Sequence, residues 1–202
     1  MRRVTLSITA TVVLGLCTSA YASVVLSENF NELTPMFSAT SVGTFSAING
    51  TNVDIVGDGL FGGLCVAPEG GNCIDMNGTG GNPQGQLQSN MLFSPGTYLL
   101  SFDLIGSGRG STDSVTAIFG NYLHTFTLGS SDTSGGIVTN QPVTLTSSGH
   151  LLFVSDVRGE VGLLLDNVIV STSAVPEPSS FVPLASALLV GVALFVRRRL
   201  AR

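Results

Sequence analysis

Few side chains in this sequence could carry out catalysis. The 202 residues include two histidines, His124 and His150, and neither lysine nor tryptophan. Neither histidine follows a G-x-S-x-G nucleophile motif, and the two are not spaced as a pair of metal ligands. His124 lies in an alternating, strand-like stretch, where a packed or half-exposed histidine is the simpler interpretation. No carboxylate pair can be singled out for glycoside hydrolysis. The sequence therefore favours a protein that is not an enzyme.

Of the three cysteines, Cys17 is among the first 22 residues, whereas Cys65 and Cys73 lie in the central part of the chain. They are eight residues apart around a loop rich in Gly, Pro and Asn. This spacing is too long for a CxxC redox pair, and further zinc ligands are not nearby. We expect a structural disulfide, which would contribute about 2.5 kcal/mol in the chain-entropy model.

Residues 75–80 partly match the start of a calcium-binding loop. Asp75 and Asn77 occupy the first and third positions, and Gly80 occupies the sixth. Thr79 replaces the acid or amide of the fifth position, and Gln86 replaces the glutamate of the twelfth. The segment is therefore predicted to be a glycine-rich turn rather than an EF-hand.

The region between the two ends of the chain is strongly acidic. Residues 23–175 contain two basic residues, Arg109 and Arg158, and twelve carboxylates, which gives a net charge of −10. Such a surface repels nucleic acid and anionic lipid, so neither is expected as a partner. Its many Gly, Ser, Thr and Asn residues favour short strands and tight turns over helices.

Period-two alternation predicts an all-β fold. Gly120-Asn121 and Asn49-Gly50 each separate two strand-like stretches and predict two-residue hairpins. The number and spacing of strands favour an antiparallel β-sandwich of the jelly-roll type. Residues 57–85 are expected to be the least ordered. The predicted strands are 24–30, 45–48, 53–56, 86–93, 97–105, 115–119, 122–128, 142–147, 149–155 and 161–171.

The N-terminus has the three parts of a secretory signal peptide. Basic residues at 2–3 precede an apolar stretch at 4–16, and Ala20-Tyr-Ala22 forms an A-x-A cleavage site. Residues 1–22 are therefore predicted to be removed, so that the mature chain starts at Ser23. A β-sandwich ectodomain at 23–173 would follow.

The C-terminus, residues 174–202, also has three parts in a fixed order. Val175, Pro176, Glu177 and Pro178 form a rigid joint, because each proline fixes φ and removes a backbone donor. The uncharged stretch 181–196 would span about 24 Å as a helix. We predict a transmembrane helix at about 180–197. It follows the joint and precedes a cluster of arginines, which should set the orientation of the helix in the membrane. This basic end is Arg197, Arg198 and Arg199.

This tail resembles the PEP-CTERM sorting signal of exported bacterial proteins. The resemblance covers about 28 of the 202 residues and rests on the motif, the apolar span and the basic end occurring together. It implies a membrane-bound processing enzyme, an exosortase, as a partner. It also implies tethering to the membrane before processing and release to the cell surface or extracellular matrix afterwards. The alternative is an ordinary C-terminal anchor that is retained.

Short motifs in the ectodomain resemble the galactose-binding-type jelly rolls that PEP-CTERM proteins commonly carry. Residues 27–31 look like their first strand and residues 161–170 like their last; 73–78 and 109–113 also match. In such sandwiches a structural Ca²⁺ often ties the first strand to the last. The resemblance therefore implies a Ca²⁺ ligand at each of two matching positions, Glu28 and Asp166.

These features together predict a non-enzymatic, exported surface or extracellular-matrix protein with a structural or adhesive role. The alternative is a carbohydrate-binding module that engages exopolysaccharide. Without tryptophan, only Tyr98, Tyr122 and His124 could offer strand-borne sugar platforms.

Overall fold

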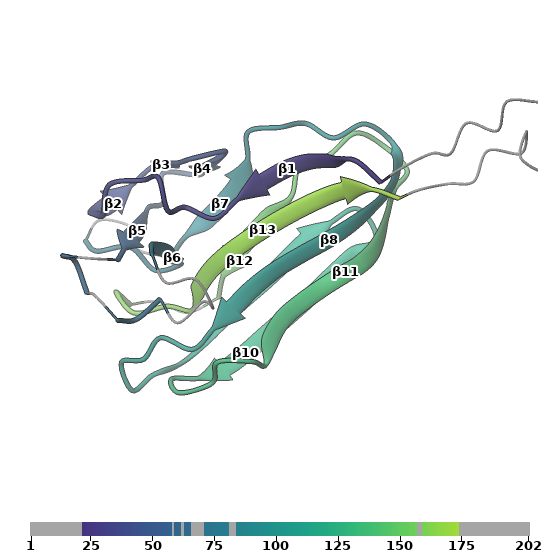
Figure 1. The fold of residues 1–202 in the computed structure, drawn as a ribbon. Helices are drawn as coiled ribbons and strands as arrows, with labels where there is room; N and C mark the ends of the chain where they lie inside the picture. Colours follow the sequence, from purple (N-terminus) through teal and green to yellow (C-terminus); the bar gives the residue numbers. More distant parts are fainter. Residues whose placement is uncertain are drawn as a thin grey trace, which may run out of the picture. The chain divides into compact units, whose positions relative to one another are not determined.

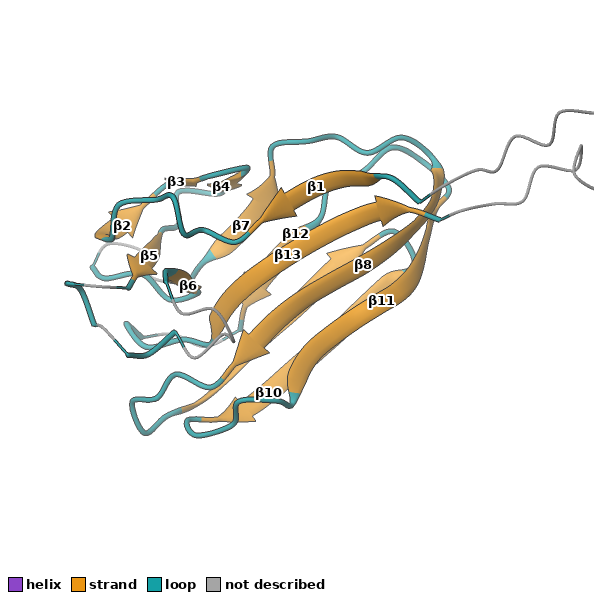
Figure 2. Ribbon diagram, in the orientation of Figure 1, coloured by secondary structure: helices purple, strands orange, loops and turns teal. Residues whose placement is uncertain are grey.

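The computed structural model describes residues 22–57, 59–61, 63–65, 71–80, 84–156 and 159–173. Every regular element in these ranges is a β-strand (Figure 2). Within the same ranges, no helix is long and apolar enough to cross a bilayer. Most of the predicted signal peptide and the whole predicted sorting tail lie outside the described residues. The tail residues concerned are Val175, Pro176, Glu177, Pro178, Arg197, Arg198 and Arg199.

Thirteen strands follow one another along the described chain, separated by turns and loops. They are β1 (Val24–Glu28), β2 (Met36–Ala39), β3 (Ser41–Val42), β4 (Phe45–Ala47), β5 (Val53–Val56), β6 (Cys73–Asp75), β7 (Gln86–Ser89), β8 (Gly96–Ile105), β9 (Thr112–Phe119), β10 (Tyr122–Gly129), β11 (Gly136–Leu145), β12 (Leu152–Ser155) and β13 (Leu164–Thr172).

The strands form two antiparallel sheets that pack face to face (Figure 1). The seven-stranded sheet has the order β11-β8-β13-β6-β5-β2, and β1 also pairs with β13. The six-stranded sheet has the order β10-β9-β12-β7-β4-β3. From β7 onward the chain crosses repeatedly between the sheets, as in jelly rolls. The predicted antiparallel sandwich is therefore confirmed.

Strand β13 sets the long axis of the larger sheet. It begins at Leu164, which pairs with Asp75 of β6, and ends at Thr172, which pairs with Tyr98 of β8. The last strand also meets the first residues of the domain, because Thr172 N donates to Ser23 O over 2.8 Å. We call the end of the sandwich at Ser23 and Thr172 the terminal end, and the end at Asp75 the distal end.

One continuous core lies between the sheets, built from the inward side of each alternating strand. Its centre is aromatic: Phe102 and Phe153 are 5.1 Å apart and Phe93 and Phe119 are 4.9 Å apart, both edge to face. Such pairs add to the stabilisation that burial itself provides. Among the described residues, the buried core runs from Leu26 to Val170. Residues 22–173 thus form one compact unit with its own core.

One predicted hairpin is confirmed and the other is wrong. Gly120-Asn121 joins β9 to β10 in continuous antiparallel register. Asn49-Gly50 does form a turn, in which both residues have positive φ (56° and 69°). However, β4 before it and β5 after it belong to different sheets. The turn thus carries the chain from one sheet to the other. Which sheet the next strand joins depends on residues far away in the sequence, and the turn residues alone do not specify it.

The stretch 57–85, expected to be the least ordered, contains a strand inside the larger sheet. Strand β6 pairs with β5 on one side and with β13 on the other, and its residues are buried. It was missed because Cys73-Ile-Asp75 is only three residues long and lies among Gly and Asn. Its burial on both faces removes the alternation that predicts a strand.

Candidate functional site

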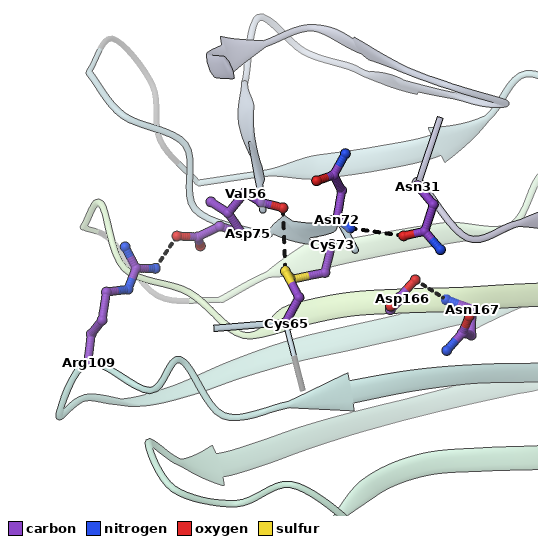
Figure 3. The surroundings of a disulfide bond; sticks show 9 residues. All are labelled: Asn31, Val56, Cys65, Asn72, Cys73, Asp75, Arg109, Asp166 and Asn167. Carbon is purple, nitrogen blue, oxygen red and sulfur yellow. Dashed lines mark hydrogen bonds and ion pairs between the residues drawn. A yellow bond between two sulfur atoms is a disulfide. The ribbon is translucent and has the colours of Figure 1, made fainter. Parts of the chain in front are cut away.

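The distal end is organised around a buried carboxylate, Asp75. It lies at the end of β6 with no exposed surface. Its Oδ1 accepts backbone N–H groups from Asn77, at 3.0 Å, and from Gly162, at 2.9 Å. Its Oδ2 forms an ion pair with the guanidinium of Arg109 (Figure 3). One carboxylate therefore joins three segments: the exit from β6, the β8–β9 loop and the approach to β13.

The close approach at Gly162 depends on its lack of a side chain. A Cβ there would lie 2.7 Å from Asn77 N and 2.9 Å from Asp75 Oδ1, closer than real contacts allow. Glycine therefore lets the backbone reach the carboxylate directly.

Burial raises the pKa of the Asp75 carboxyl from its ordinary 3.8 to about 7. The positive charge of Arg109 and the hydrogen bonds from Asn77 and Arg109 oppose this increase, whereas nearby Asp54 adds to it. Loss of hydration is the larger effect, because a charged carboxylate without water is costly. Asp75 therefore takes up and releases its proton near neutral pH.

Asp54 of β5 lies directly opposite Asp75 and also accepts several hydrogen bonds. Its Oδ1 accepts the backbone N–H groups of Ser38, at 2.8 Å, and of Thr79, at 2.9 Å. Its Oδ2 accepts the Thr79 hydroxyl at 2.6 Å. The partial resemblance of residues 75–80 to a calcium loop thus corresponds to a turn in which Thr79 bonds to Asp54 and Asp75 faces Arg109.

The predicted disulfide between Cys65 and Cys73 is confirmed. The two Cα atoms are 5.7 Å apart, and Cys65 Sγ lies 3.4 Å from the carbonyl oxygen of Val56 (Figure 3). The bond draws the loop after β5 onto the outer face of the larger sheet. There a second, small apolar cluster forms, separate from the main core. Its members are Val56, Leu64, Cys65, Cys73, Ile105 and Leu164.

Two exposed phenylalanines lie next to this covered face. Phe37 of β2 and Phe61 of the β5–β6 connection form an edge-to-face pair with 5.6 Å between ring centroids. They are 41% and 46% exposed. The Arg109 guanidinium carbon lies 5.4 Å from the Phe61 centroid, within cation–π distance. The Phe37–Phe61 pair was not identified from the sequence. The one signal for it was the position of Phe61 among the glycines of residues 59–63, which is typical of an exposed aromatic residue.

The structure places the two predicted calcium ligands on opposite faces of the larger sheet. Glu28 pairs with Val168, whose side chain is in the core, and the Glu28 carboxylate accepts the N–H of Phe30 and Thr44 at 3.1 and 2.8 Å. Asp166 instead opposes Asp103 on the outer side, is 4% exposed, and its Oδ1 accepts Asn167 N at 2.7 Å. The reversal occurs because β13 has a bulge between Asp166 and Ile169.

The described residues contain no group of three or more His, Cys, Asp or Glu side chains that could hold a metal ion. Calcium at Glu28 and Asp166 stays a prediction. A single ion bridging both carboxylates does not match their placement, so any effect of calcium would have to arise at one of the two separately.

The remaining candidate residues take different positions. Tyr98 is buried, and its hydroxyl donates to Ser94 O at 2.8 Å, so this ring is part of the core. Tyr122 and His124 stack on β10 with 6.3 Å between centroids. His150 Nδ1 lies 2.8 Å from Ser89 O. The histidines are therefore in separate surroundings on different segments.

No protein-family model and no curated protein matches this sequence. Among solved structures, it is similar to the K3 and K1 cleaved adhesin domains of Lys-gingipain from Porphyromonas gingivalis W83. The K3 domain is 12% identical over 76% of this chain and 100% of that chain, with a TM-score of 0.49. The K1 domain is 13% identical over 73% of this chain and 98% of that chain, with a TM-score of 0.46. The C-terminal CBM6 of the Zobellia galactanivorans laminarinase LamC is 13% identical over 73% of this chain and 98% of that chain, with a TM-score of 0.38. These values are too low to carry a conclusion about function.

The raised pKa of Asp75 predicts how stability depends on pH. Between about pH 4 and pH 7 the folded chain keeps a proton that the unfolded chain has released. The contribution of Asp75 to the free energy of unfolding is therefore full below its ordinary pKa of 3.8 and is lost as the pH rises through about 7. Denaturant unfolding should show the advantage of wild type over Asp75→Asn decreasing from pH 4 to pH 8.

Asp132 provides a control of opposite sign. Backbone hydrogen bonds from Ser134 and Gly135 lower the pKa of this exposed carboxyl. Its small contribution is present above the ordinary pKa and is lost as the pH falls, so Asp132→Asn should show no decreasing advantage between pH 4 and pH 8. If the stability advantage of wild type over Asp75→Asn instead grew with pH, the effect of Arg109 on the pKa of Asp75 would be larger than the effect of burial.

Proposed function

We propose that this chain is an exported, non-enzymatic protein of the bacterial surface or extracellular matrix, with a structural or adhesive role. A PEP-CTERM tail would deliver it, and an exosortase would process it at the membrane. The observation that carries the proposal is the position of the two domain ends. Ser23 N donates to Thr172 Oγ1 at 3.0 Å, so the described chain begins and ends at the terminal end.

This arrangement suits a tethered domain. A membrane segment that follows residue 173 would leave from the terminal end, and the distal end would be at the other end of β13. Strand β13 has nine residues, about 30 Å when extended. The exposed Phe37–Phe61 pair and the disulfide loop would then be held away from the point of attachment.

The ordered hydrogen bonds at Ser23 and Thr172 also suit the predicted processing. They join residues close to the predicted cleavage sites at Ala22 and at the Pro-Glu-Pro joint, and Ser173 N also donates to Thr97 O at 3.1 Å. Trimming at both ends would leave every strand intact.

Processing is tested by intact-mass spectrometry of protein from its native host. We expect a mature N-terminus at Ser23 and a C-terminus near residues 176–180. Glu177→Ala should leave the first cleavage unchanged and reduce the second, if the joint is what the processing enzyme recognises. Native protein that keeps residues 181–202 would show that the tail is a permanent anchor.

A carbohydrate-binding module that engages exopolysaccharide is the second candidate. The Phe37–Phe61 pair favours it, because exposed rings beside a cation offer an apolar face for a sugar ring and a donor for its hydroxyl groups. Tyr98, one of the three rings that could have offered a strand-borne sugar platform, does not support this function, since that ring is in the core.

A pull-down of residues 23–173 with exopolysaccharide from the host tests the second candidate. Phe61→Ala should weaken binding by about tenfold, the loss expected for one aromatic contact. Leu92→Ala is the matched control, since Leu92 is equally apolar and 59% exposed but lies in the β7–β8 connection. Failure of the wild type to bind would exclude the carbohydrate-binding module and leave the structural role in place.

Calcium is tested by thermal unfolding of the same domain in Ca²⁺ and in chelator. An ion that binds only the folded state should raise the melting temperature of the wild type. Glu28→Gln and Asp166→Asn, measured separately, should identify which carboxylate is responsible. An unchanged wild-type melting temperature would mean that neither residue holds a structural calcium ion.

A further inference from the structure

Strand β10 forms an edge of the six-stranded sheet. The turn that precedes β10 bonds to β11, because Asn121 N donates to Thr144 O at 3.1 Å and Thr144 N donates to Asn121 Oδ1 at 2.8 Å. The eight residues of β10 pair with β9 in unbroken antiparallel register, from Tyr122 opposite Phe119 to Gly129 opposite Thr112. Among the described strands, β9 is its only partner in a sheet. In an antiparallel pair, every second residue directs its N–H and C=O away from the neighbour. Strand β10 therefore presents a regular row of backbone donors and acceptors at this edge.

The other edges carry features that block pairing with a further strand. Strand β11 has a bulge between Val138 and Gln141, with Asn140 at φ 50°, and it contains Pro142. Strand β2 has four residues and an irregular register, and β3 has two residues. Strand β1 has five residues and a bulge near Val24. Short strands, bulges and proline are the usual protections of sheet edges, and β10 has none of them.

The sequence of β10 also lacks the charges that keep edges apart. Tyr-Leu-His-Thr-Phe-Thr-Leu-Gly contains no Asp, Glu, Lys or Arg, in a region whose net charge is −10. Two copies of so acidic a domain repel each other over most of their surface. The carboxylate of Asp156 on this side bonds to Thr116 of β9, one strand in from the edge. Strand β10 itself brings no carboxylate to a contact along this edge.

Side chains along the outer side of β10 leave the edge accessible. The hydroxyls of Thr125 and Thr127 are each 2.8 Å from a hydroxyl of β9, that of Thr116 or Ser114. These contacts hold the threonines over their own sheet. Leu123 is 70% exposed, which is the largest exposure among the big apolar side chains of the described residues.

We infer that β10 is an interaction surface for a second copy of this chain. Two β10 strands would pair antiparallel about a two-fold axis and join two six-stranded sheets into one of twelve strands. A two-fold axis suits identical edges, because each outward N–H of one copy meets a C=O of the other. Leu123 of each copy would then be covered by the partner strand.

The contact is small, so its strength depends on local concentration. The shared edge is one strand of eight residues, about 27 Å long, whereas a standard protein interface uses about 20–30 residues from each partner. Association should therefore be weak in dilute solution. It should be stronger where many copies are attached to one surface, since tethering raises the effective concentration.

Sedimentation equilibrium of residues 23–173, a domain with its own complete core, tests the inference. The wild type should dimerise as its concentration rises. Leu123→Asp should raise the dissociation constant by about tenfold or more. Ile137→Asp is the matched control: Ile137 is 50% exposed on the protected edge strand β11, and its substitution adds the same charge.

Hydrogen exchange provides a readout that a loss of folding would not imitate. In the wild type, every second amide of β10 should exchange more slowly at high protein concentration, while the β9 amides stay unchanged. This slowing should be absent in Leu123→Asp and present in Ile137→Asp. A wild type that stays monomeric at all concentrations, or a dimer that only Ile137→Asp disrupts, would overturn the inference.

Discussion

The loss of water around one carboxylate is the constraint on which the distal end depends. Asp75 has no exposed surface, and three segments that are far apart in the sequence supply its hydrogen bonds. A buried carboxylate is tolerated only when such partners are present. The exit from β6, the β8–β9 loop and the turn at Gly162 are therefore fixed by one requirement. Arg109, one of two basic residues between 23 and 175, is the charged partner in this arrangement.

At the same end, a loop held by the disulfide covers part of the outer face of the larger sheet. The disulfide brings Leu64 and Cys65 over Ile105 and Leu164, and this makes a second apolar cluster outside the main core. Phe61 belongs to the same β5–β6 connection and lies exposed against Phe37 and Arg109. The exposed ring pair therefore involves the segment that the disulfide holds against the sheet.

The sequence was sufficient for features that depend on neighbouring residues. Alternation identified β8 and β10, Gly120-Asn121 identified the hairpin that joins β9 to β10, and the spacing of Cys65 and Cys73 identified the disulfide. Features that depend on distant residues were not accessible in this way. Strand β6 is too short and too buried to alternate, and Asn49-Gly50 does not reveal that β4 and β5 lie in different sheets. The bulge in β13 placed Glu28 and Asp166 on opposite faces, since one extra residue reverses every side chain beyond it.

The direction of β13 has a mechanical consequence. If the protein is held at its C-terminal end and pulled at its distal end, the force acts along the axis of β13. The antiparallel neighbours of β13, β8 and β1, lie along the same axis. Force in that direction shears many backbone hydrogen bonds at once. A pull that separates Ser23 from Thr172 would instead open the β1–β13 pairing one bond after another, starting at the terminal end. The sandwich should therefore resist tension between an anchor and a distal contact much better than tension between its own two ends.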